Sequence, residues 1–250
     1  MDSFFDKTTP IVVFFGPPCS GKFSIMRRIS LYLEQEGFTI LYDIMHAEVN
    51  KYDKSVSDRI ERHWHEIVWH RYEPRMVNFP SSILLHVMDN KARKICQLLY
   101  INGKICANDI LHHNLFNELK SLNNRIIWAL TFDIDSQVDE NLKYQIRDLY
   151  DKVAHIPYKT IVICNKVDLL TKSPDSLQRC YKHINEKYSI EMAFLEKLHP
   201  KTFGFLYSKN KMMFNVFSSG VYIESIDHRQ YVASNNIYPQ SLWNSILSLI

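Results

Sequence analysis

The element that decides the fold reads Phe14-Phe15-Gly16-Pro17-Pro18-Cys19-Ser20-Gly21-Lys22-Phe23-Ser24. An apolar run of strand length, Ile11 to Phe15, leads into it, and a segment of helical periodicity, Ser24 to Glu36, follows it and ends at Gly37. A glycine, four further residues, a second glycine and a lysine form the pattern of a phosphate-binding loop between a strand and a helix. The sequence therefore predicts a phosphate site at the end of a buried strand.

The predicted loop would hold an anion mainly with its backbone. Successive N–H groups can wrap a phosphate, and the dipole of the following helix adds positive potential. Lys22 would reach the β- and γ-phosphates, and Ser24 would offer a hydroxyl to the α-phosphate. Cys19 is interpreted as a small space-filling side chain, because no histidine is placed beside it to activate a nucleophile. The predicted phosphate-binding residues are Gly16, Pro17, Pro18, Cys19, Ser20, Gly21, Lys22, Phe23 and Ser24.

A second motif, Asn165-Lys166-Val167-Asp168, follows the apolar run Thr160 to Cys164. A carboxylate at Asp168 can accept both N1–H and N2–H of guanine, and adenine offers no such pair of donors. Asn165 would hold the loop and meet the base edge, while the stem of Lys166 would cover the face of the base. A small-residue loop after the last predicted strand adds Ser218 and Ser219 near guanine O6. Together these residues predict a guanine site, with a plain surface turn as the alternative.

Apolar runs alternate with helical patterns along the chain, which is typical of a three-layer α/β fold with a mostly parallel central sheet flanked by helices. No repeat or flexible linker interrupts the pattern, so we expect a single domain over residues 1–250. Strands are expected at 11–15, 38–42, 83–87, 95–100, 125–132, 160–164 and 212–217. Helices are expected at 24–36, 51–76, 108–122, 141–153, 176–198, 219–235 and 239–250.

Composition narrows the class of protein. A formal net charge of +3 over 250 residues gives no electrostatic footprint for direct nucleic-acid binding. Five cysteines without a CxxC pair predict a reducing compartment and no zinc knuckle. No run reaches the length of a membrane span and no signal peptide is recognised, so we expect a cytoplasmic protein without a membrane partner. His63, Glu66 and His70 share one face of a predicted helix, where a polar surface is favoured over a metal site.

These motifs resemble the GPN-loop GTPases, a branch of the P-loop GTPases. The family's GPxGSGKS loop is similar to the segment at 16–24, and its [NT]-K-x-D-L-L element matches Asn165 to Leu170. Looser matches cover residues 41–48, 52–60, 98–104 and 132–136. The resemblance implies a P-loop NTPase fold that binds GTP or GDP.

Three positions depart from the family where catalysis is performed. Phe23 replaces the hydroxyl residue that binds Mg²⁺, Tyr100 replaces the acidic residue that holds Mg²⁺ through water, and Lys104 replaces a glutamine. The family's Gly-Pro-Asn tripeptide keeps only its proline, Pro80. Phosphoryl transfer depends on positioning and on neutralisation of charge by Mg²⁺. The sequence therefore predicts weak or absent hydrolysis and a compromised Mg²⁺ site, and it assigns no catalytic residue.

The resemblance also implies partners. It favours a homodimer, or a heterodimer with a related GPN-loop GTPase in which this chain is the non-catalytic half. Such a dimer would pair through the face that carries the nucleotide. Its expected role is the assembly and nuclear import of RNA polymerase II, with subunits of that enzyme as clients. The expected location is the cytoplasm, with shuttling to the nucleus.

Two other functions stay open at this point. A P-loop kinase for a small molecule or nucleotide would use Asp43 as the base that accepts a substrate hydroxyl proton. The motif at Asn165 to Asp168 argues against that function, because a kinase does not need a guanine reader. A nucleotide-free interaction scaffold would keep only the fold.

Overall fold

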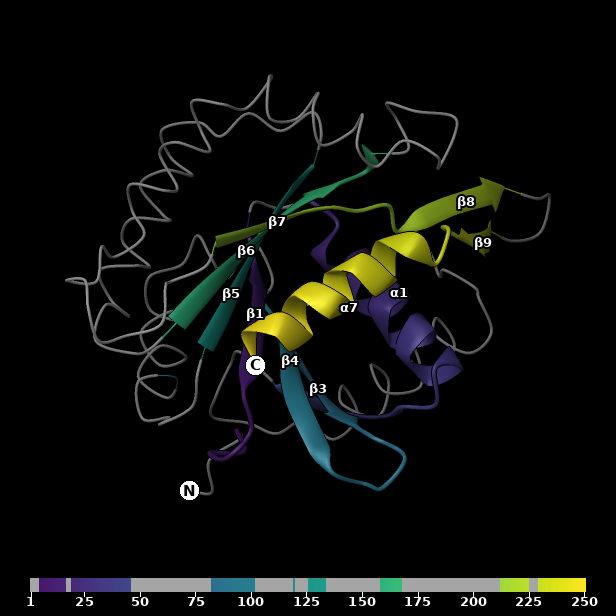
Figure 1. The fold of residues 1–250 in the computed structure, drawn as a ribbon. Helices are drawn as coiled ribbons and strands as arrows, with labels where there is room; N and C mark the ends of the chain where they lie inside the picture. The colour runs from purple at the N-terminus through teal and green to yellow at the C-terminus, as the bar shows by residue number, and fades with distance from the viewer. Residues whose placement is uncertain are drawn as a thin grey trace.

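The strand that precedes the loop, β1 (Ile11–Phe15), lies inside a seven-stranded sheet in the computed structural model (Figure 1). The structure describes residues 5–16, 19–45, 82–101, 119, 126–133, 158–167, 212–224 and 229–250. The other strands of this sheet are β2 (Thr39–Met45), β3 (Ser82–Met88), β4 (Lys94–Tyr100), β5 (Ile126–Asp133), β6 (Tyr158–Asn165) and β7 (Met212–Val216). They lie side by side in the order β2-β3-β4-β1-β5-β6-β7.

The sheet is mostly parallel, as the sequence predicts. β1 pairs in parallel with β4 on one side and with β5 on the other, and the parallel series continues through β6 and β7. Among the described strands of this sheet, only β3 runs the other way, pairing antiparallel with β2 and with β4. β2 therefore runs in the same direction as β1, but β3 and β4 lie between them.

Continuous apolar runs form the middle of the sheet, because a strand covered on both faces needs apolar side chains at successive positions. All five side chains of β1 are buried, and in β5 the buried run extends from Ile126 to Phe132. Phe15 and Trp128 pack edge to face in this core, with ring centroids 5.5 Å apart. The loop after β1 therefore follows directly from a fully buried strand.

Two helices, α1 (Lys22–Gln35) and α7 (Ile237–Leu249), pack against each other on one face of the sheet (Figure 1). α1 lies towards β2 and β4, and α7 lies towards β6 and β7. Phe38, just after α1, meets Trp243 of α7 edge to face at 5.4 Å between ring centroids. No helix in the described part of the chain has the length and apolar character needed to cross a membrane.

Among the described residues, one predicted element is wrong. The segment 219–235, expected as a helix, forms a separate antiparallel hairpin of β8 (Gly220–Glu224) and β9 (Arg229–Ala233). The physical reason is the composition of the segment, because β-branched and aromatic residues such as those at 221–223 and 231–232 favour strands. The helices expected at 51–76, 108–122, 141–153 and 176–198 lie outside the described residues, apart from Leu119, which is helical and buried.

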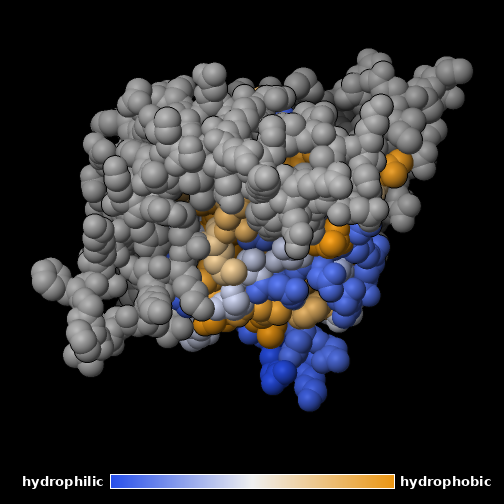
Figure 2. All heavy atoms as spheres, turned by 45° about the horizontal axis from the view of Figure 1, so that its top comes forward, coloured by the Kyte–Doolittle hydropathy of each residue, from blue (hydrophilic) through white to orange (hydrophobic). Residues whose placement is uncertain are grey.

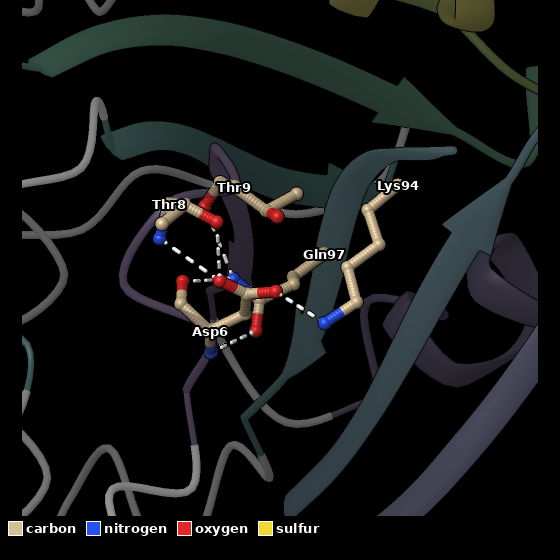
Figure 3. A network of polar contacts seen from close by, with 5 residues as sticks. All are labelled: Asp6, Thr8, Thr9, Lys94 and Gln97. Carbon is tan, nitrogen blue, oxygen red and sulfur yellow. Dashed lines mark hydrogen bonds and ion pairs between the residues drawn. The ribbon is translucent and has the colours of Figure 1, made fainter. Parts of the chain in front are cut away.

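A hydrogen-bond network fixes the segment before β1 to β4 (Figure 3). Asp6 N–H donates to Gln97 Oε1 at 2.9 Å, and Gln97 Nε2 donates to the carbonyl oxygens of Asp6 at 3.0 Å and Thr9 at 3.1 Å. The Asp6 carboxylate accepts from Lys94 Nζ and from the Thr8 hydroxyl and N–H. These hydrogen bonds, that of Lys94 above all, hold the pKa of Asp6 well below its usual range. The network lies at the start of β1, and the glycine loop lies at the opposite end of that strand.

The turn between β3 and β4 is also remote from the loop. Asp89 accepts hydrogen bonds at 2.9 Å from the backbone N–H groups of Lys91 and Arg93, which closes the turn. Residues 90–94 are exposed. Figure 2 shows the lower tip of the molecule, where Figure 1 places this turn, as hydrophilic surface. The composition of residues 90–94 is typical of a turn in contact with solvent.

Candidate functional site

The loop at the carboxyl end of β1 requires glycine at its first position. Gly16 has a φ of +137°, and a Cβ there would lie 2.1 Å from the backbone oxygen of Thr131 on β5. The chain can therefore leave β1 in this direction only without a side chain. Cys19 is exposed and has a φ of +64°, while Pro17 and Pro18 lie outside the described residues.

The second glycine of the loop touches the second predicted motif. Gly21 has a φ of +82°, and a Cβ there would lie 2.1 Å from Nδ2 of Asn165, at the end of β6. That Nδ2 donates to the carbonyl oxygen of Ser20 at 3.1 Å, and Asn165 Oδ1 accepts from the Ser219 hydroxyl at 3.2 Å. Ser20, Asn165 and Ser219 are all buried. The Asn165 amide thus joins the loops that follow β1, β6 and β7.

Lys22 folds back over the glycine loop. Its Nζ donates to the carbonyl oxygen of Gly16 at 2.9 Å and to Ser20 Oγ at 3.4 Å, and the residue is buried. The ammonium group therefore lies across the loop at the N-terminus of α1, where the helix dipole also favours an anion. Ser24 is partly buried in the first turn of the same helix. This arrangement of charge and backbone can hold a phosphate.

The loops after β6 and β7 lie side by side. Val167 N–H donates to the carbonyl oxygen of Phe217 at 3.2 Å, and Phe217 N–H donates to that of Cys164 at 2.7 Å. Ser218 is buried in the same place. Asp168, the predicted reader of guanine, lies outside the described residues, so its contact with a base stays a prediction.

Lys166 has a charged neighbour on the adjacent strand. Its Nζ lies 2.8 Å from Oδ2 of Asp133 at the end of β5, and its φ is +61°. The lysine side chain is 40% exposed and that of the aspartate 15%. The ion pair fixes the direction of Lys166 beside the loop that follows β6. The position of its stem over a base stays a prediction.

The flank of the loop that faces β4 is apolar. The ring of Phe23, in the first turn of α1, meets the ring of Tyr100, the last residue of β4, with centroids 6.0 Å apart and planes at 76°. Tyr100 is buried and Phe23 is partly buried against the core. Lys104, the third departure from the catalytic pattern, lies outside the described residues.

The chemistry of these two positions does not fit Mg²⁺. This ion prefers hard oxygen ligands in octahedral geometry, carboxylates above all. Phe23 offers no oxygen, and Tyr100 offers a phenol in place of a carboxylate. Within the described ranges, no three His, Cys, Asp or Glu side chains come together as a possible metal site.

Sequence patterns do not reveal one further connection. Arg28, buried in α1, donates from Nε to the Ser234 hydroxyl at 3.2 Å and from Nη2 to the Ser234 carbonyl oxygen at 2.7 Å. The same Nη2 donates to Oδ1 of Asn236 at 2.5 Å. The Ser234 hydroxyl donates in turn to the carbonyl oxygen of Ser218 at 2.5 Å. The helix that starts at the phosphate loop is thereby linked to the loop after β7.

A buried parallel strand, a glycine loop that closes on a helix N-terminus and a lysine folded over that loop define an α/β fold of the P-loop NTPase type. No family model matches the chain, and no curated protein matches it. Among solved structures it is similar to nucleolar GTP-binding protein 1 of Plasmodium falciparum, at 13% identity over 98% of this chain and 90% of that one, with a TM-score of 0.39. The mammalian SRP receptor matches at 13% identity over 96% of this chain and 100% of that one, with a TM-score of 0.37. Likeness of this degree assigns no function.

Proposed function

We propose that this chain is a GTPase-like protein that binds GTP or GDP and hydrolyses it weakly or not at all. The phosphates would lie in the loop at 16–24, against backbone N–H groups and Lys22. The base would lie against the loops at 165–168 and 218–219. The chain would then act by the state of its bound nucleotide, and not by rapid turnover.

The contacts of Asn165 carry this proposal. A surface turn with the sequence Asn-Lys-Val-Asp has no reason to bury its asparagine or to touch the glycine loop. Here Asn165 is 1% exposed, and its amide bonds Ser20 of the phosphate loop and Ser219 of the small-residue loop. Three motifs that are far apart in the sequence therefore meet at one place, which supports a shared nucleotide site.

The apolar flank of the loop supports slow hydrolysis. Efficient phosphoryl transfer uses Mg²⁺ to bridge and neutralise the β- and γ-phosphates. Phe23 and Tyr100 occupy the two positions that would hold it, and neither offers a suitable ligand. We therefore expect hydrolysis several orders of magnitude slower than in an active GTPase.

The strand order argues against a kinase that uses Asp43. This residue belongs to β2, which is separated from β1 by β3 and β4. Three strand spacings amount to about 14 Å, far beyond the hydrogen-bond reach that a general base needs at a phosphate beside β1. Guanine-nucleotide binding is therefore favoured over kinase activity.

A titration of the full chain with fluorescent GDP tests the proposal, with unlabelled GDP, ADP and xanthosine diphosphate as competitors. We expect GDP to compete best. Preference for ADP would favour the kinase hypothesis, and no binding of any nucleotide would favour the nucleotide-free interaction scaffold. In the Asp168→Asn variant, xanthosine diphosphate should compete better than GDP, because an amide can donate to the C2 carbonyl of xanthine and cannot accept two guanine donors.

The finer assignment to the GPN-loop branch is supported by the sequence resemblance alone. It adds to the proposal a dimer, formed with a second copy or with a related GTPase, and a role in RNA polymerase II assembly in the cytoplasm and nucleus. Copurification of the full chain followed by mass spectrometry tests this part. Recovery of a related GTPase or of polymerase subunits would support it, and their absence under conditions that retain GDP would count against it.

A further inference from the structure

Two aromatic rings meet where a P-loop protein normally holds its metal. Phe23 directly follows the loop lysine. Tyr100 lies level with Phe14 in the pairing of β4 and β1, and the N–H of the next residue, Ile101, donates to the carbonyl oxygen of Phe14 at 3.1 Å. The backbone of β1 thus fixes Tyr100 beside the start of the loop. The T-shaped contact with Phe23, at 6.0 Å between centroids, is of the favourable kind for aromatic pairs.

We propose that this aromatic pair excludes the metal, so that the chain binds guanine nucleotide without Mg²⁺ and prefers the diphosphate to the triphosphate. This inference rests on the proposed function, because it concerns the same site. It adds the charge state of the ligand and the absence of a metal requirement.

The exclusion follows from the chemistry of the pair. Mg²⁺ gives up its water reluctantly and is bound through carboxylates and phosphate oxygens. Beside Phe23 and Tyr100 it would meet two aromatic rings and no carboxylate, the ligand that normally replaces part of its water shell. One wall of the site is therefore unfavourable to the ion, and the nucleotide phosphates alone would have to retain it.

The preference for a diphosphate follows from the charges that remain. The described positive groups at the loop are Lys22, which lies across it, and the N-terminal end of α1. A γ-phosphate brings further negative charge, which Mg²⁺ normally neutralises. Without the ion this charge is left beside an apolar pair, so the triphosphate should bind more weakly.

The test compares nucleotide binding by the full chain in EDTA and in Mg²⁺, measured by isothermal titration calorimetry with GDP and with GTP. We expect the Kd for GDP to change by less than about twofold between the two media, and GTP to bind roughly tenfold more weakly than GDP in EDTA. Binding of GDP only in Mg²⁺ would overturn this inference and leave the proposed function standing. No binding in either medium would overturn both.

A double variant, Phe23→Ser with Tyr100→Asp, restores a hydroxyl and a carboxylate. It should bind GDP at least about tenfold more tightly in Mg²⁺ than in EDTA. The matched control is Phe38→Ser, which breaks a different T-shaped pair, with Trp243, at the opposite end of α1. That control should lower the unfolding midpoint without creating any dependence on Mg²⁺. A double variant that folds and stays indifferent to Mg²⁺ would contradict the assignment of these positions.

A second measurement uses the unmodified chain and does not depend on the folding of a variant. Electron paramagnetic resonance of Mn²⁺ with the GDP complex should show no immobilised ion beyond what free GDP retains. Stoichiometric Mn²⁺ in the protein–GDP complex would overturn the exclusion of the metal.

Discussion

The two flanks of the phosphate loop carry opposite chemistry. Towards β6 and β7, Asn165 connects Ser20 and Ser219 through buried hydrogen bonds. Towards β4, Phe23 and Tyr100 meet through ring edges and faces. Because different strands support the two flanks, the polar flank can stay intact while the other becomes apolar. Under the proposed function, recognition of the nucleotide and use of a metal therefore depend on different flanks of one loop.

The largest expected effect comes from breaking the frame that both flanks share. Gly16→Ala places a Cβ 2.1 Å from the Thr131 oxygen at a φ of +137°. We expect a loss of about 3 kcal/mol or more in the free energy of unfolding, because the obstacle is backbone. Gly37→Ala is the matched control, since its φ is +85° but a Cβ there would meet nothing within 4 Å. It should cost about 1 kcal/mol. Equal losses in urea denaturation would contradict the steric explanation.

The next effect isolates the polar flank. Asn165→Ala removes the amide that bonds Ser20 and Ser219, and should weaken GDP binding about tenfold or more while costing about 1–3 kcal/mol of stability. The control is Asn215→Ala, which removes an equally buried asparagine whose partners, Ser245 and Ser241, lie on α7. Its stability should fall by a similar amount with no change in the Kd for GDP, measured by calorimetry. A parallel loss of GDP binding in both variants would indicate a general effect on folding.

A smaller effect tests the link between α1 and the loop after β7. Ser234→Ala removes the hydroxyl that accepts from Arg28 and donates to the Ser218 carbonyl oxygen. We expect a loss of about twofold to fourfold in GDP affinity, because Arg28 still bonds the backbone of Ser234. Ser248→Ala, on the exposed side of α7, should have no effect on GDP binding. Indifference of the Ser234 variant would limit this link to a structural role.

The smallest effect on the site is expected from the far end of β1. Asp6 has a depressed pKa in the folded state, so it stabilises the fold above its ordinary pKa and this contribution is lost as the pH falls below about 4. Asp6→Asn should therefore lower the unfolding temperature at pH 7, and the difference from the unmodified chain should shrink in acid. Neither flank of the loop should respond, so the Kd for GDP at pH 7 should stay constant. A difference that persists unchanged in acid would contradict the role of the charge.

Much of the fold is predictable because its central strands are continuous apolar runs. The runs at 11–15, 125–132 and 160–164 are long enough and apolar enough to mark buried strands, and they agree with β1, β5 and β6. The hairpin of β8 and β9 is missed because each strand has only five residues, and periodicity does not separate helix from strand in segments this short. The order of the strands in the sheet also cannot be predicted from local sequence patterns, because contacts between distant segments determine it.

The candidate site is predictable only in part, for a similar reason. The loop glycines and Asn165 belong to motifs whose spacing carries a physical requirement, and the structure brings these residues together. The contact of Phe23 with Tyr100 joins two positions far apart in the sequence, and its geometry has no local signal. The sequence gives no reason to expect Arg28 to be buried, because arginines in helices are mostly exposed. The hydrogen bonds of Arg28 to Ser234 and Asn236, in the segment between β9 and α7, have no local signal in the sequence.

The contact between Phe23 and Tyr100 also bears on how readily this site can change over evolutionary time. A serine at position 23 alone would face the Tyr100 ring and leave a void. An aspartate at position 100 alone would place a charge against the Phe23 ring, and burying a charge without a partner costs several kcal/mol. Each single substitution towards a metal site is therefore unfavourable, and only the two together complement each other. A chain that reaches this state has few single-step routes out of it.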